Sequence, residues 1–120
     1  MTAPPATTEL QSFKAEFFKA LAHPIRIRIL ELLRVRERGV RELQAILDLD
    51  QSTVSQQLAV LRAKNVVGAS REGTAVRYAI RDESVGELLD AARRIFNNQL
   101  VGTQTMLRAL RREARRPGRR

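Results

Sequence analysis

The residues between positions 50 and 61 are of types that can hydrogen-bond to DNA. Val54, Leu58 and Leu61 recur at helical spacing and define one apolar face. The opposite face holds short, neutral, hydrogen-bonding side chains instead of the Glu/Lys pairs of an ordinary solvated helix, namely Ser52, Ser55, Gln56 and Gln57. Serine, threonine and glutamine can bind base edges in a major groove, and hydroxyl groups also bind phosphate oxygens. The pattern predicts a helix that lies on nucleic acid; the alternative is an ordinary surface helix rich in Gln and Ser.

Composition narrows the class of protein. The 120 residues suffice for one domain, whose core must be aliphatic because only 4% of the residues are aromatic. A net charge of +9 favours an anionic partner. The absence of cysteine excludes disulfides, thiolate metal sites and a cysteine nucleophile. The sequence contains no membrane-spanning apolar run and no signal-peptide pattern, so we expect a cytoplasmic protein that does not enter a membrane.

Helical periodicity and breakers divide the chain into elements. We expect a disordered tail over 1–8 and then helices over about 9–22, 24–36, 40–47 and 51–64. Asp50 is a candidate N-cap of the fourth helix, because its carboxylate can accept the free N–H groups of the first turn. Two short helices joined by a tight turn, the second with a hydrogen-bonding face, predict a helix-turn-helix.

Two short strands are expected after these helices, over 67–71 and 75–80, with Glu72-Gly73 at the turn between them. Arg71 and Arg77 lie on either side of this turn. A basic hairpin that follows a helix-turn-helix is the wing of a winged helix, so we expect a mainly α protein with a small β-hairpin (α+β).

A long helical stripe closes the sequence, from a cap at Asp82 or Ser84 to Leu110, with Gly102 as its weak point. A single domain of this size cannot bury the whole stripe together with the apolar face of the first helix. We therefore expect one winged domain over 9–110 that dimerises through its N- and C-terminal helices. The alternative is a monomer folded as a closed bundle.

Positive charge is concentrated at the C-terminal end, where seven arginines between Arg108 and Arg120 face a single acidic residue, Glu113. This segment can act as a phosphate-binding arm, as a frayed helix end or as a solubilising tail. Because Pro117-Gly118 disfavours regular structure, we expect residues 111–120 to form a flexible tail.

The segments 18–30, 52–61 and 66–80, in this order, resemble the opening signature, the recognition helix and the wing of ArsR/SmtB-type bacterial transcription regulators. The resemblance implies a homodimeric winged helix-turn-helix that binds double-stranded DNA at an inverted-repeat operator. It implies that the major groove is faced by Gln51, Ser52, Thr53, Ser55, Gln56 and Gln57. It places Arg71 and Arg77 on the wing, near phosphates or the minor groove.

The family is best known for metal sensing, and the sequence departs from it there. One sensor type has cysteine ligands in a stretch that corresponds to 42–47, which holds none. Another type uses ligands at positions that correspond to Asp82, Ser84, Ile95 and Asn98, of which only Asp82 can serve. We therefore expect neither of the usual metal sites. Regulation without a ligand, by a small-molecule effector or by a sensing partner protein fits better.

The single histidine, His23, is the remaining candidate metal ligand. A site that combined it with Glu9, Glu16 or acidic residues of a partner chain would favour Ni(II) or Zn(II). A structural role at the junction before Pro24 is the better interpretation, so no cofactor is predicted.

These features bear on three candidate functions. A DNA-binding transcription regulator fits the polar helix, the basic wing and the resemblance together. A winged-helix module that binds another protein is the alternative. An enzyme is not expected, because the chain offers no nucleophile–base pair and no Gly-rich phosphate loop.

Overall fold

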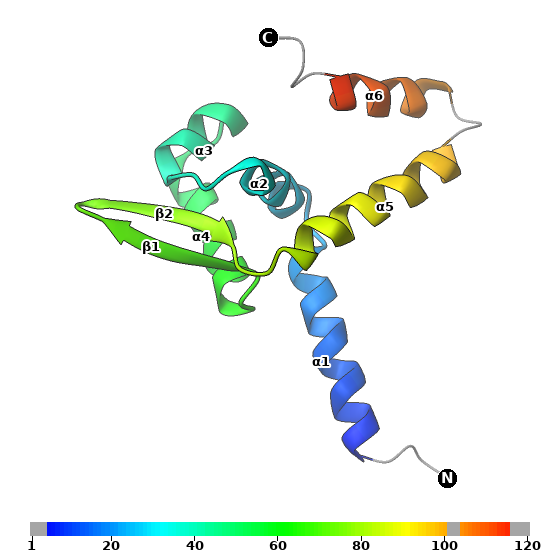
Figure 1. Ribbon diagram of the computed structural model, residues 1–120, viewed down its shortest axis with the longest axis horizontal. Helices are drawn as coiled ribbons and strands as arrows, with labels where there is room; N and C mark the ends of the chain where they lie inside the picture. The colour runs from blue at the N-terminus through cyan, green and yellow to red at the C-terminus, as the bar shows by residue number, and fades with distance from the viewer. Residues whose placement is uncertain (1–4, 101–103, 116–120) are drawn as a thin grey trace. The chain divides into compact units, whose positions relative to one another are not determined.

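The computed structural model describes residues 5–100 and 104–115. Figure 1 traces the order of its elements, which are α1 (Pro5–Leu21), α2 (Pro24–Val35), α3 (Val40–Leu47), α4 (Gln51–Ala63), β1 (Val67–Glu72), β2 (Ala75–Ile80), α5 (Ser84–Leu100) and α6 (Gln104–Arg115). They form two compact units, residues 1–86 and 87–120. The predicted fold class, a mainly α winged helix-turn-helix with a β-hairpin, is confirmed.

The first unit is built around α2, which contacts α1, α4 and β2, while α3 packs on α4. The aliphatic core expected from the composition lies here, because the apolar stripes of α2, α3 and α4 converge on one another. Its fully buried side chains are Ile29, Leu30, Leu43, Val54, Leu58, Leu61, Val66 and Val67. The apolar face predicted from Val54, Leu58 and Leu61 is therefore the buried, inner face of α4.

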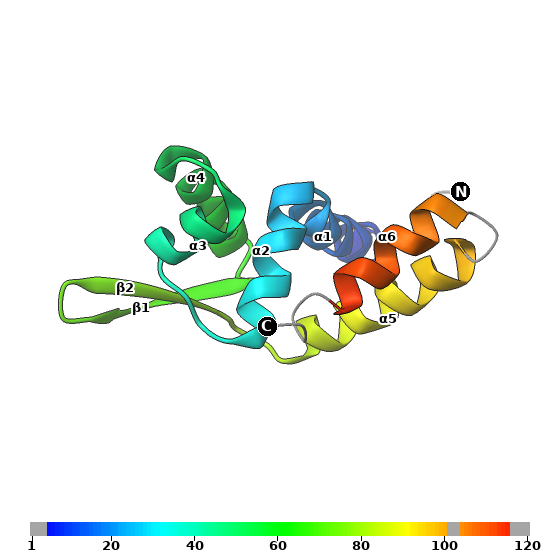
Figure 2. The ribbon, with the colours of Figure 1, turned by 90° about the horizontal axis from the view of Figure 1, so that it is seen from above.

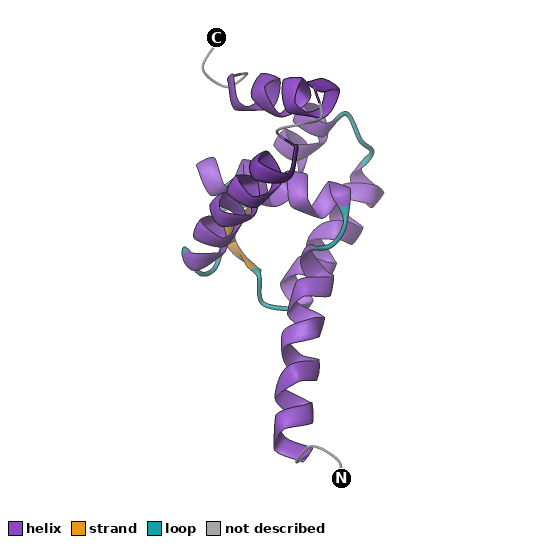
Figure 3. Ribbon diagram, turned by 90° about the vertical axis from the view of Figure 1, so that its right-hand side faces the viewer, coloured by secondary structure: helices purple, strands orange, loops and turns teal. Residues whose placement is uncertain are grey.

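α1 begins earlier than predicted. It starts at Pro5 instead of near Glu9, so four of the eight residues expected to be disordered are helical. Proline is compatible with this start because the first turn of a helix needs no N–H at that position. Residues 1–4 of the expected tail lie outside the described residues. Figures 1 and 3 show the N-terminal half of α1 extending beyond the other helices of its unit.

The wing is an antiparallel hairpin in which Val67 pairs with Ile80 and Glu72 with Ala75. Gly73 makes the turn with a φ of +64°, in the left-handed region that glycine adopts without strain. Arg38 adds a bridge to the outer edge of β2, since its backbone N–H and C=O both bond to Tyr78. The tip of the hairpin extends beyond the helices of the first unit (Figure 2).

The C-terminal stripe forms two helices, where the sequence predicted one. α5 ends at Leu100 and α6 begins at Gln104; Gly102, the expected weak point, lies outside the described residues. α6 continues to Arg115, so the first five residues of the expected flexible tail are helical, and residues 116–120 are not described. No described helix is long and apolar enough to cross a bilayer.

Candidate nucleic-acid interface

A tight turn of three residues sets α4 beside α3. Asp48 ends α3 in the left-handed region, at a φ of 58°, and its N–H bonds to the carbonyl of Gln44 at 2.8 Å. Asp50 then caps α4, because its carboxylate accepts the N–H of Thr53 at 2.9 Å. The N-cap predicted at Asp50 is confirmed. Hydrogen bonds from the side chain and backbone of Thr53 hold the pKa of Asp50 below its ordinary value.

The six predicted base-reading residues of α4 do not share one environment. Gln51, Ser52 and Gln56 are exposed, whereas Thr53, Ser55 and Gln57 are half-buried. The amide oxygen of Gln57 accepts a hydrogen bond from Arg26 of α2 at 2.8 Å. The exposed face of α4 thus presents neutral donors and acceptors, as the sequence indicated, with Gln57 at its border.

The two predicted wing cations lie on opposite faces of the hairpin, because Arg71 is paired with Val76 and Arg77 with Ser70. Arg71 is exposed. Arg77 instead donates to the backbone carbonyl of Glu37 at 3.2 Å and lies 3.9 Å from its carboxylate. Of these two cations, Arg71 is the one presented to solvent, whereas Arg77 is held by its contacts with Glu37.

Arg38 anchors the wing, and the sequence analysis missed it. The residue is 8% exposed, and its side chain donates to the carbonyl of Leu32 at 3.1 Å and to the Glu42 carboxylate at 2.7 Å. Arg36 also donates to Glu42. Partial burial opposes ionisation of Glu42, but the hydrogen bonds from Arg38 and the charge of Arg36 outweigh it and lower the pKa. Because no apolar period or cap marks Arg38, only its four-residue spacing from Glu42 hints at the pair.

A shallow hollow of about 540 Å³ lies beside the start of α4 and adds two polar residues that the sequence analysis did not consider. Arg41 and Gln44 of α3 line it together with Gln51, Ala45 and Leu49. Arg41 is exposed and Gln44 is half-buried. An arginine next to neutral amides suits a phosphate beside a base edge.

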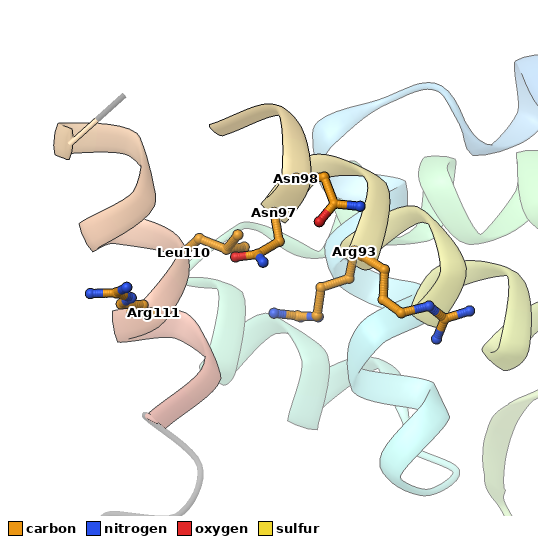
Figure 4. A pocket seen from close by; sticks show the side chains of 6 residues that line it. Arg93, Asn97, Asn98, Leu110 and Arg111 are labelled. Carbon is orange, nitrogen blue, oxygen red and sulfur yellow. The ribbon is translucent and has the colours of Figure 1, made fainter. Parts of the chain in front are cut away.

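A second hollow, of about 420 Å³, lies within the C-terminal unit. Figure 4 shows Arg93, Asn97 and Asn98 on α5 and Leu110 and Arg111 on α6 around it; Arg94 completes the lining. Three guanidinium groups and two amides make its walls strongly basic.

His23 has a structural role at the α1–α2 junction. Its Nδ1 accepts the N–H of Ile25 at 3.1 Å, so the imidazole caps the first turn of α2. Among the described residues, no group of three or more His, Asp or Glu side chains is placed to hold a metal ion. Asp82 accepts the N–H of Ser84 at 2.9 Å, at the start of α5.

A helix-turn-helix with an exposed polar second helix and a flanking hairpin defines a winged helix-turn-helix DNA-binding protein. The chain belongs to the arsR family of bacterial regulatory proteins, whose family model matches residues 23–68. It is 48% identical over 103 residues to the uncharacterized HTH-type transcriptional regulator Rv0081 of Mycobacterium tuberculosis. The aligned residues make up 85% of this chain and 90% of that protein. The chain is therefore a DNA-binding transcription regulator of this family, which is not a family of enzymes.

A further relative and two solved structures are similar to this chain over most of its length. The biofilm growth-associated repressor of Agrobacterium fabrum is 37% identical over 92 residues, or 77% of this chain and 79% of that protein. The crystal structure of Rv0081 covers 83% of this chain and 97% of its own, with a TM-score of 0.74. A homodimeric winged helix-turn-helix DNA-binding domain from Mycobacterium bovis, Mb0332, has a TM-score of 0.75 at 31% identity, covering 82% of this chain and 91% of that one.

Proposed function

We propose that this regulator acts in the cytoplasm as a homodimer that reads an inverted-repeat operator, with one α4 in each half-site. The observation that carries the proposal is the exposed neutral face of α4, set on a stripe in which Val54 and Leu61 are 0% exposed. A firmly seated helix keeps its outer side chains in one orientation, as base reading requires. The proposed readers are Gln51, Ser52, Thr53, Ser55, Gln56 and Gln57.

Phosphate contacts are assigned to cations that flank this helix. Arg71 on the wing and Arg41 beside the start of α4 are exposed on the same unit. Arg77 contributes in the bound state by exchanging its contact with Glu37 for a phosphate or the minor groove. Such contacts fix the position of the protein on DNA and make its affinity depend on salt.

Dimerisation is assigned to the terminal helices. Phe13 of α1 is 74% exposed and Phe18 is 56% exposed, while Ile95 and Phe96 of α5 are each about half exposed. Apolar surface of this extent on helices is a common mark of an interface between chains. The homodimeric relative Mb0332 supports the same assembly.

Binding to DNA is proposed to need no metal ion. Ile95 and Asn98 replace ligands at two of the positions used by one sensor type, and Asp82 is engaged with the backbone of Ser84. Release from DNA is then assigned to a small-molecule effector or to a sensing partner protein. The basic hollow lined by Arg94 and Arg111 is where an anionic effector would be sought.

Fluorescence anisotropy tests the proposal. DNA from upstream of the protein's own gene is compared with a scrambled duplex at about 150 mM salt, near physiological ionic strength, with chelator present. Wild-type protein should prefer the first duplex, and Gln56→Ala should reduce that preference about tenfold, the usual discrimination of one good base contact. An equal loss on both duplexes would remove Gln56 from base reading.

The wing is tested in the same assay. Arg71→Ala should weaken binding to both duplexes alike and make the salt slope shallower by roughly one per protomer. Arg28→Ala, which removes an exposed arginine of α2 that pairs with Glu31, is the matched control and should change neither quantity. Binding to any duplex that disappears at physiological salt would favour the protein-interaction module instead.

A further inference from the structure

The guanidinium of Arg26 joins three helices, and this contact is the basis of a proposal about how α4 is positioned. Its Nε donates to the carbonyl of Ala20 at 2.6 Å, and one terminal nitrogen donates to the carbonyl of Lys19 at 3.2 Å. The other terminal nitrogen donates to the amide oxygen of Gln57 at 2.8 Å. One side chain of α2 therefore bonds both to the end of α1 and to the middle of α4.

Arginine suits this position for a physical reason. The last carbonyls of a helix lack partners within the helix and carry partial negative charge, so a cation at the end of α1 is favourable. The flat guanidinium offers several donors in fixed directions, which lets one group serve α1 and α4 together. A lysine at position 26 would keep the charge and lose the fixed geometry.

Gln56 and Gln57 differ because one residue turns the helix by about 100°. Gln57 lies at the edge of the buried stripe of Leu58 and Leu61 and is half-buried. Gln56 is exposed and points away from that stripe. The hydrogen bond from the charged guanidinium, at 2.8 Å, uses one of the two lone pairs of the Gln57 amide oxygen and holds that oxygen toward Arg26 of α2.

The two kinds of contact on α4 constrain different motions. Apolar burial of Val54, Leu58 and Leu61 holds the helix against the core, but it is not directional. A charge-assisted hydrogen bond is directional and resists rotation of the helix about its own axis. The second link between α1 and α4, the ion pair of Lys64 with Glu16 at 3.5 Å, is exposed and weak.

We propose that Arg26 is a positioning residue, and that Gln57 is its anchor on α4 rather than a base-reading side chain. The Arg26–Gln57 contact sets which side chains of α4 face DNA and fixes α4 to the C-terminal end of α1. The proposal rests on the proposed function for its effect on DNA reading, and it modifies the role of one of the six proposed readers. The contact itself exists in the free protein and can be tested without DNA.

The first experiment is amide hydrogen exchange of the full chain followed by NMR. Arg26→Met and Gln57→Met each remove the contact and keep most of the side-chain volume. Both should accelerate exchange in the same amides of α4, around residues 56–60, by about tenfold, as expected for loosening of a local unit. Gln56→Met and Arg28→Met are matched controls and should leave these amides unchanged. Unchanged exchange in Arg26→Met would overturn the proposal.

A double-mutant cycle separates anchoring from base reading. The preference for upstream over scrambled DNA is measured for Arg26→Met, Gln57→Met and the double variant. If the contact acts as one unit, the double variant loses no more preference than either single variant, about fivefold in each case. If Gln57 reads bases directly, the two losses multiply, and the anchoring role is wrong.

The two readouts keep the failures apart. Faster exchange in both variants would support the anchor whatever the protein does with DNA. If the wild-type protein at the same time shows no preference among duplexes, the proposed operator reading is refuted and the anchor stays in place. Arg26→Lys adds a third comparison with Arg26→Met. It should restore less than half of the exchange protection of the α4 amides if the direction of the hydrogen bond matters, and all of it if charge alone is sufficient. Full restoration by lysine would contradict the role assigned to the guanidinium geometry.

Discussion

α4 and α1 are both amphipathic helices of the same unit, yet their apolar faces have opposite fates. Val54, Leu58 and Leu61 of α4 are at most 1% exposed, whereas Phe13 and Phe18 of α1 are 74% and 56% exposed. The core of the first unit thus packs against the apolar face of α4, the helix proposed to contact DNA, and leaves the phenylalanines of α1 exposed. A periodic apolar stripe in a sequence therefore identifies a helix, but it does not identify what covers the apolar face of that helix.

The largest expected effect comes from cutting into the covered stripe. Leu58→Ala should lower the free energy of unfolding by about 2–5 kcal/mol, because it removes apolar contacts and leaves a cavity between α4 and α2. Phe13→Ala removes a larger side chain and should cost the isolated fold almost nothing. Denaturant unfolding of both variants at low protein concentration measures the contrast. Similar losses for the two would show that α1 is covered within its own chain.

Dimer association should depend on the exposed face of α1, although the stability of the single chain does not. Phe13→Ala should raise the dissociation constant of the dimer about 100-fold, since two copies each lose roughly 1.5 kcal/mol of apolar burial. Sedimentation velocity over a range of concentrations measures this constant. Phe18→Ala is a second variant of the same face, and Thr74→Ala at the exposed turn of the wing is a control that should leave association unchanged. A monomeric wild-type protein would favour the closed-bundle alternative.

A third contrast lies at the α1–α2 junction. His23→Ala should lower the free energy of unfolding by about 1 kcal/mol, because the N–H of Ile25 loses its acceptor. His23→Asn should restore most of the loss, since asparagine is a good N-cap. Thermal unfolding with and without Ni(II) or Zn(II) is the measurement. A metal that stabilises wild type but not His23→Ala would show that the histidine is a ligand after all.

The middle of the chain could be predicted well from sequence because each of its elements carries its own signal. The bounds of α3 and α4 and the cap at Asp50 follow from periodicity and from a side chain next to the helix it caps. The ends were predicted less well. α1 extends to Pro5, because a proline is compatible with the first turn of a helix. α6 extends to Arg115, because Pro117-Gly118, from which a flexible tail was predicted, comes only after that residue.

The contacts around the site could not be predicted from local pattern. Arg26 and Gln57 are 31 residues apart, and Arg77 reaches Glu37 across 40. The sequence indicated Gln57 and Arg77 as DNA-facing residues, and nothing in it marked Arg26 or Glu37 as their partners. Only the packing of α2 on α4 and β2 brings these partners together. The residue types of a DNA-facing helix can be recognised in a sequence, but which of them is already bound within the protein cannot.

Acid pH is expected to change stability least, and its effect concerns the wing more than α1. Glu42 joins Arg36 and Arg38 beside the wing, and its pKa lies below its ordinary value of 4.5. A carboxyl group with a lowered pKa in the fold adds stability that is present above pH 4.5 and is lost as the pH falls through the lowered value. Glu42→Gln should therefore flatten the acid limb of stability against pH, and it should weaken the anchoring of the wing more than that of α1.

Unfolding measured at pH values from neutral down to about 3, below the ordinary pKa of a carboxyl group, tests this sign. Glu72→Gln at the exposed turn of the wing is the matched control and should leave the acid limb as it is in wild type. A limb that steepens on Glu42→Gln would mean that burial, which opposes ionisation, outweighs the two arginines. The wing would then be held by the backbone bridge between Arg38 and Tyr78 without help from the ion pairs.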